Sequence, residues 1–230
     1  MFRPAPATVS GIIERAGDIK DVIIILKPNA GSITGTVYQT DGRTPVGADV
    51  RVTLNLGGAP VTVTTDPSGV YRFAPILPAN SYQLFVEDPF TGLKGYGSVY
   101  VKAGAEAAAN LRLLGKGTVI VQVVDADGIT PVPSASVNLS MSTYPFDKAS
   151  GNISPSDNGQ ITFNNITEGS FSVSVRDSYG FGGRIQGVIP ADNQTVTVRI
   201  RIAPSGEVKG KFLSPDGAAP IPNAQIKLVS

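Results

Sequence analysis

The chain has 230 residues, a formal net charge of +1 and neither Cys nor His. Their absence excludes disulfides, thiol and His-metal sites and His-based catalytic triads, and because Lys and Arg form no basic stripe, we expect no nucleic-acid binding. No apolar run approaches the ~18 residues of a membrane span, and residues 1–10 show no signal peptide. No carboxylate pair recurs at equivalent positions, so we expect no enzyme activity, cofactor or resident metal.

The sequence contains an internal repeat. The pattern Asp-Gly-x-x-Pro occurs three times, starting at Asp41, Asp127 and Asp216, at separations of 86 and 89 residues. Each copy follows a segment of alternating apolar residues and precedes a second, shorter one. Self-similarity of this kind is typical of tandem modules, and it predicts one module per ~87 residues.

The phase of the repeats divides the chain into four segments. Two complete modules are flanked by the closing strands of a preceding module and the opening strands of a following one, with boundaries at residues 1–28, 29–114, 115–203 and 204–230. A sandwich assembled from the two ends would lack its central strands. We therefore expect an internal piece of a longer repetitive polypeptide, rather than chains that join head to tail by strand complementation.

Alternating apolar and polar residues predict β-strands in both modules. In residues 195–202, Val and Ile alternate with Thr and Arg, and this period of two turns one face to a core and the other to water. Residues 103–114 are rich in Ala, which favours a helix, but the aligned segment 191–203 has a strand pattern. We therefore predict a strand at residues 107–114 and an all-β fold of tandem antiparallel β-sandwich domains.

The repeats resemble carboxypeptidase regulatory-like domains. The first module carries Gly-x-Ile-x-Gly-x-Val at residues 31–37, Tyr-x-Phe at 71–73 and Tyr-x-Leu-x-Val at 82–86, and the second carries similar segments. The first departs from the family at Asn80-Ser81, where Gly is frequent. The resemblance implies transthyretin-like (prealbumin-like), Ig-like sandwiches of about seven strands, mostly in tandem and without a catalytic motif. It also implies tandem repeats of a large bacterial or archaeal surface protein.

Two loops are candidate partner-contact surfaces. They combine aromatic rings, a cation and glycines, and their residues are Phe90, Lys94 and Tyr96 in the first module and Tyr179, Phe181 and Arg184 in the second. This composition suits contact with another chain or with the face of a sugar. Alternatively, the rings cover the end of the sandwich or pack on the adjacent module.

Two further features have both a functional and a structural interpretation. Four N-x-[ST] sequons are candidate N-glycosylation sites, at Asn138, Asn152, Asn165 and Asn193, although such sequons also arise by chance where Asn is common in turns. Asp125 and Asp127 could supply oxygens to Ca²⁺. Because Asp125 has no counterpart in the other copies, we interpret the Asp-Gly residues as turn formers.

Together these features predict a structural segment of an extracellular rod, stalk, adhesin shaft or filament at the cell surface. Its partners would be the neighbouring repeats of the same chain, with self-association into fibres as a further option. Two alternatives stay open. One is an array of modules that bind protein or carbohydrate, such as surface glycans; the other is an accessory segment of a larger enzyme or toxin.

Overall fold

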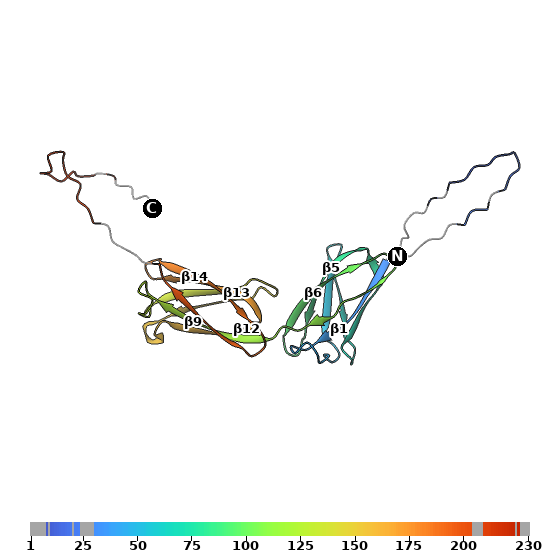
Figure 1. Cartoon of the computed structure of the whole chain (residues 1–230), viewed down its shortest axis with the longest axis horizontal. Coiled ribbons are helices and arrows are strands. Elements are labelled where there is room, and N and C mark those ends of the chain that lie inside the picture. Colours follow the sequence, from blue (N-terminus) through green and yellow to red (C-terminus); the bar gives the residue numbers. More distant parts are fainter. Residues whose placement is uncertain are drawn as a thin grey trace.

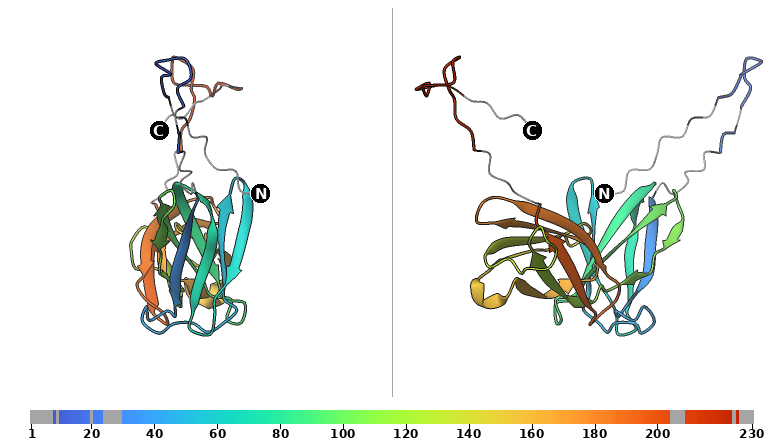
Figure 2. Two further views of the ribbon diagram at one scale, coloured as in Figure 1. Left: turned by 90° about the vertical axis from the view of Figure 1, so that its right-hand side faces the viewer. Right: turned by 60° about the vertical axis from the view of Figure 1, so that its left-hand side comes forward.

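The computed structural model describes residues 8, 10–19, 21–23, 30–203, 209–223 and 225. In this part of the chain all regular structure is β, apart from one 3-10 turn at Pro155–Asp157. The strands form two groups that follow one another along the molecule (Figure 1). Figure 2 turns the molecule so that the first group faces the viewer (left) and so that the second comes forward (right). The predicted all-β fold is confirmed.

The first sandwich contains β1 to β8. In one sheet, β1 (Ala30–Tyr38) pairs antiparallel with β4 (Val70–Pro78), and its other side pairs parallel with β7 (Glu106–Ala108) and β8 (Leu111–Arg112). The second sheet is antiparallel and has the order β3-β2-β5-β6. Its strands are β2 (Arg51–Leu56), β3 (Ala59–Thr64), β5 (Asn80–Glu87) and β6 (Lys94–Val101).

The second sandwich repeats this arrangement with β9 to β15. In one sheet, β9 (Lys116–Val124) lies between antiparallel β12 (Gln160–Thr167) and parallel β15 (Thr195–Arg201). The other sheet has the order β11-β10-β13-β14. Its strands are β10 (Ala135–Met141), β11 (Lys148–Ile153), β13 (Gly169–Asp177) and β14 (Gly182–Ile189).

Each sandwich has its own hydrophobic core. In the first, Ile33, Leu54 and Leu84 are fully buried between the two sheets; in the second, Val121 and Val173 are. No buried residue is shared by the two clusters of the described chain. Strand alternation turns one face of each sheet inward, and the gap between the sheets is filled by apolar side chains. Because the two cores are separate, we expect each sandwich to act as a folding unit.

The strand predicted at residues 107–114 is interrupted between β7 and β8. The Ala109 carbonyl accepts a hydrogen bond of 2.6 Å from the buried Tyr71 hydroxyl, so it does not pair with β1. The side-chain oxygen of Asn110 accepts the Thr36 N–H instead, at 3.0 Å. The close approach requires Gly35, because a Cβ there would lie 1.8 Å from the Ala109 oxygen. The strand prediction is therefore correct for residues 107–108 and 111–112 and wrong for residues 109–110 and 113–114.

In the second sandwich, which lacks the glycine and tyrosine described above, the corresponding strand is not interrupted. In the first sandwich Gly35 pairs with Tyr71 across β1 and β4. At the corresponding positions of the second sandwich, Val121 pairs with Ile161 across β9 and β12. With no glycine and no hydroxyl at these positions, β15 pairs with β9 without a break over Thr195–Arg201. The interruption thus follows from the local sequence of the first module and is no general property of the fold.

The incomplete segments at the two ends are only partly described. Residues 10–19 and 21–23 form no strand, and Ile12 and Ile23 are exposed. In residues 209–223 the third Asp-Gly turn makes the bridge Leu213–Pro220, which corresponds to Tyr38–Pro45 and Val124–Pro131 in the two sandwiches. Ile25, Val208 and Ile226 lie outside the described residues, so the assignment of both ends to neighbouring repeats stays a prediction.

Candidate contact surfaces

The Asp-Gly turns are built by the carboxylate that opens them. Asp41 accepts hydrogen bonds from the Thr44 hydroxyl at 2.6 Å and from the N–H groups of Arg43 and Thr44 at 2.8 and 2.9 Å. Asp127 accepts the same three bonds from Ile129 and Thr130. These bonds, led by the threonine hydroxyl, lower the pKa of both carboxyls to about 2. The oxygens are engaged within the turn, and no metal-holding group of acidic side chains occurs among the described residues.

Replacing Thr44 by Val is expected to raise the pKa of Asp41 and leave that of Asp127 at about 2. The substitution removes the largest cause of the lowered pKa. A carboxyl with a lowered pKa stabilises the fold fully above its unfolded pKa of ~3.9 and loses this contribution as the pH falls through about 2. The Thr44→Val variant should lose the contribution of Asp41 to stability at a higher pH than the parent chain. Carboxyl carbon NMR during acid titration measures both residues, and an unchanged Asp41 would contradict the assignment.

The six predicted contact residues are divided between loops and strands. Phe90, Tyr179 and Phe181 lie in the β5–β6 and β13–β14 loops, and Phe90 and Tyr179 are 78% and 84% exposed. In both loops an aspartate, Asp88 or Asp177, accepts the N–H of the residue two positions on. The loops therefore begin with the same aspartate hydrogen bond, and each presents an exposed ring to solvent.

The other three predicted contact residues lie on strands. Lys94 and Tyr96 belong to β6, and Arg184 belongs to β14, where its Nε donates to the Ser172 hydroxyl at 2.7 Å. The two triads predicted from the sequence are therefore not clustered in one loop each. Tyr96 contacts the neighbouring sandwich, in line with the alternative that rings pack on the adjacent module.

The contact of Tyr96 is part of an aromatic cluster between the two sandwiches. The ring of Tyr144, in the β10–β11 loop, lies with its centroid 4.9 Å from that of Phe85 and 5.8 Å from that of Tyr96. Tyr144 also contacts Phe146 edge-on at 6.5 Å. Such pairs stabilise a contact beyond the area they bury. The sequence analysis missed Tyr144 because nothing in its local pattern marks the loop as an interface.

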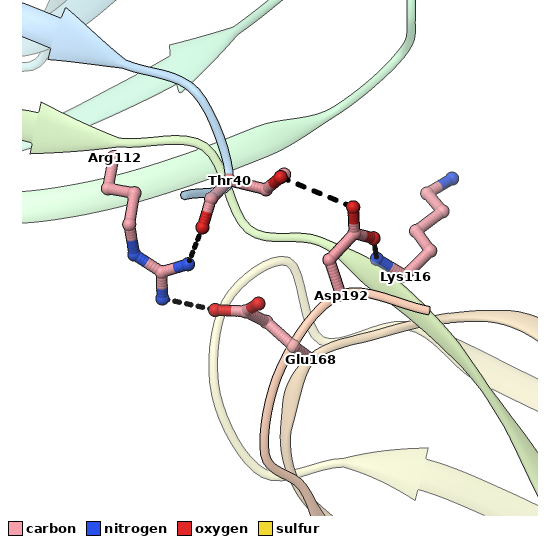
Figure 3. A network of polar contacts seen from close by, with 5 residues as sticks. All are labelled: Thr40, Arg112, Lys116, Glu168 and Asp192. Atoms are coloured by element: carbon pink, nitrogen blue, oxygen red, sulfur yellow. Dashed lines mark hydrogen bonds and ion pairs between the residues drawn. The ribbon is translucent and has the colours of Figure 1, made fainter. Parts of the chain in front are cut away.

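A polar network also joins the two sandwiches (Figure 3). Arg112, at the end of β8, donates to the Thr40 carbonyl at 2.9 Å and forms an ion pair with Glu168 of the second sandwich. The Thr40 hydroxyl donates to Asp192 at 3.2 Å, and the other Asp192 oxygen accepts the Lys116 N–H at 2.8 Å. The Glu168 side chain is only 6% exposed. The second sandwich thus supplies two carboxylates to groups at the end of the first.

The three residues between β8 and β9, residues 113–115, are themselves tied to the sheets. Leu113 is fully buried, and its N–H donates to the Tyr38 carbonyl at 2.9 Å. The Leu114 N–H donates to the Lys94 carbonyl at 2.7 Å, and the Gly115 carbonyl accepts the Glu168 N–H at 2.8 Å. A link whose backbone is bonded to both sides cannot act as a free hinge. We call residues 113–116, with the polar network and the aromatic cluster, the junction.

Of the residues in the polar network, the arginine has a counterpart at an outer end of the sandwiches, but the two carboxylates have none. Strand register places Arg201 where the first sandwich has Arg112, and Arg201 is exposed. By the same register, Ala79 and Ala103 stand where the second sandwich has Glu168 and Asp192. The carboxylates are therefore specific to the contact between these two modules.

The four sequon asparagines are all exposed in the second sandwich. Asn138 and Asn152 project from β10 and β11, and Asn165 and Asn193 have positive φ angles of 59° and 58°. Asn tolerates the left-handed conformation better than other side chains, which gives a structural reason for the last two. Their exposure is compatible with N-glycosylation, which stays a prediction.

This two-layer fold with an all-β core defines a β-sandwich repeat protein. A family model of the carboxypeptidase regulatory-like domain matches residues 32–114, so the resemblance is confirmed for the first sandwich. No curated protein matches the chain. Among the described residues no helix is long and apolar enough to cross a membrane.

Solved structures with a similar arrangement have low sequence identity. The minor pilin GBS52 of Streptococcus agalactiae is 13% identical over 79% of this chain and 100% of the pilin, with a TM-score of 0.49. A streptococcal ancillary pilin is 12% identical over 83% of this chain and 69% of the pilin, with a TM-score of 0.40. The Bacillus anthracis TIE protein is 15% identical over 76% of this chain, with a TM-score of 0.35, and the match spans 34% of that protein.

Proposed function

We propose that the two sandwiches are successive modules of an extracellular rod, such as a stalk, an adhesin shaft or a filament, and that their work is mechanical. The observation that supports this best is the junction. Its linking residues are hydrogen-bonded to both sandwiches, and ion-paired and aromatic contacts flank them. A spacer needs a fixed angle between units more than it needs a cleft.

The physical argument rests on separate cores and a short, bonded link. Each sandwich can bear load on its own core, because no buried apolar residue is shared between the described clusters. The short link limits the angles that the modules can sample, so that stacking sets reach and stiffness. The partners of each sandwich are the neighbouring repeats of the same chain. Self-association into fibres would continue this stacking of modules from one chain to the next.

Surface location is the direct test of this role. Antibodies against residues 30–203 should label intact cells of the source organism, and protease added from outside should remove the signal. Labelling only after the cells are opened would contradict an extracellular rod.

Replacing Arg112 by Ala is expected to loosen the junction. The change leaves the buried Glu168 carboxylate without its cation, which costs about 1–3 kcal/mol, less than a fully buried pair, because the Arg112 side chain is 40% exposed. Backbone ¹⁵N relaxation should then give separate, shorter correlation times for the two sandwiches. Arg201→Ala is the matched control, since it removes the equivalent arginine from the outer end. If Arg112→Ala, Arg201→Ala and the parent chain all give the same correlation times, the Arg112–Glu168 ion pair does not hold the junction rigid.

A further inference from the structure

The outward face of the β3-β2-β5-β6 sheet carries polar and aromatic side chains next to the junction. Cross-strand pairing places Gln83 beside Ser98 and Phe85 beside Tyr96. These side chains point away from the core, because Leu84 between them is fully buried. The face is thus a ladder of amide, hydroxyl and ring groups that the core does not use.

Two adjoining hollows cover this face. One, of about 460 Å³, is lined by residues of β2, β5 and the turns beside them, and the other, of about 260 Å³, lies between the two sandwiches. They share Gln83 and Phe85 as lining residues, so they lie side by side, and we call the two hollows together the groove. The polar groups of the first hollow include Asn55, Asn80 and Ser81. The wall contributed by the second sandwich is Ser142, Thr143, Tyr144 and Phe146.

The chemistry of the lining selects for an uncharged ligand with many hydroxyls. Among the residues that the structure describes, no Asp, Glu, Lys or Arg lines either hollow. The amides of Asn55, Asn80 and Gln83 can each donate and accept hydrogen bonds. The rings of Tyr96 and Phe146, 46% and 60% exposed, offer flat apolar surfaces. Sugar rings present C–H groups on their faces and hydroxyls around their rim, and this pattern matches both kinds of group.

We propose that this groove binds a neutral oligosaccharide. A peptide captured by strand addition would need a free strand edge, whereas the groove lies across the face of a sheet. An anionic glycan would find no cation among the described lining residues to compensate its charge. The bound chain extends over the β5 face, stacks on Tyr96 and Phe146 and hydrogen-bonds to the side-chain amides.

The second sandwich lacks such a face. In the same register, Ser174 and Arg184 occupy the positions of Phe85 and Tyr96. The hollow on that face, lined by Ser170, Gln186 and Val188 among others, has only the buried Phe171 as a ring. The site is therefore a property of the first sandwich with the β10–β11 loop docked against it, and it goes beyond a spacer role.

The test uses the whole chain and a panel of defined sugars. Cellohexaose, maltohexaose, hexa-N-acetylchitohexaose and mannohexaose are titrated into ¹⁵N-labelled protein, with a hexamer of galacturonic acid as the anionic comparison. We expect at least one neutral hexamer to bind and to shift the signals of residues 80–85 and 142–146. Absence of binding up to about 10 mM, or preference for the anionic hexamer, would overturn the proposal.

Point variants locate the site. Gln83→Ala and Phe146→Ala, one on each side of the groove, should weaken binding about threefold to tenfold, as expected for one lost hydrogen bond or ring contact. Phe212→Ala removes an exposed ring that lines neither hollow and should have no effect. Unchanged affinity of both groove variants, with melting temperatures equal to that of the parent, would also overturn the proposal. The relaxation results for Arg112→Ala are independent of these titrations, so failure of the sugar site would leave the spacer role standing.

Discussion

Replacing Val173 by Asp is expected to unfold the second sandwich and to leave the first one folded. Val173 lies at the centre of β13, is fully buried and belongs to the core of the second sandwich. An unpaired carboxylate at this position costs several kcal/mol, or its pKa rises until it is neutral. Since small domains are stable by only ~5–15 kcal/mol, this is a large part of the total.

Hydrogen exchange read by mass spectrometry measures the outcome. Amide protection should fall across residues 116–201 and persist across residues 30–112. Ser174→Asp is the matched control, because Ser174 is the next residue on the same strand and is exposed; it should keep protection in both sandwiches. Equal loss in the first sandwich after Val173→Asp would show that the two modules do not fold as separate units.

Replacing Gly35 by Ala should destabilise the first sandwich alone. The new Cβ would lie 1.8 Å from the Ala109 oxygen and 2.6 Å from its carbonyl carbon. Both atoms belong to the backbone, so the strand must move, and the hydrogen bond from Tyr71 to Ala109 is lost with it. Overpacking costs about 1–3 kcal/mol, and an unsatisfied buried hydroxyl adds a similar amount.

Calorimetry with separate transitions for the two sandwiches tests the effect of this glycine. The transition of the first sandwich should fall by about 10 °C or more, and that of the second should stay. Gly47→Ala is the control in the same sandwich, because no atom lies within 4 Å of a Cβ at that position. If the first sandwich of the Gly35→Ala variant melts at the same temperature as in the parent chain, the strand can shift without a loss of stability.

Local sequence determined most of the fold. Period-two alternation marks the strands because a sheet turns alternate side chains to the core, and the Asp-Gly turns recur with the same three hydrogen bonds at Asp41 and Asp127. The Ala-rich segment is predicted as β, correctly for residues 107–108 and 111–112, only because its repeat partner, β15, has a clear strand pattern. Glycines at residues 31 and 35 were visible as a motif, but their reason, a close backbone approach, was not.

Tertiary structure alone decided the junction and the groove. Arg112 and Glu168 are 56 residues apart, and Thr40 and Asp192 are 152 apart, so no local pattern pairs them. The break at Ala109 likewise depends on a hydroxyl 38 residues away. Strand propensity acts between neighbours in the sequence, whereas an interface depends on which side chains the fold brings to one end of a sandwich. The sequence by itself therefore determined the two sandwiches, and only their packing determined how one sandwich is held against the next.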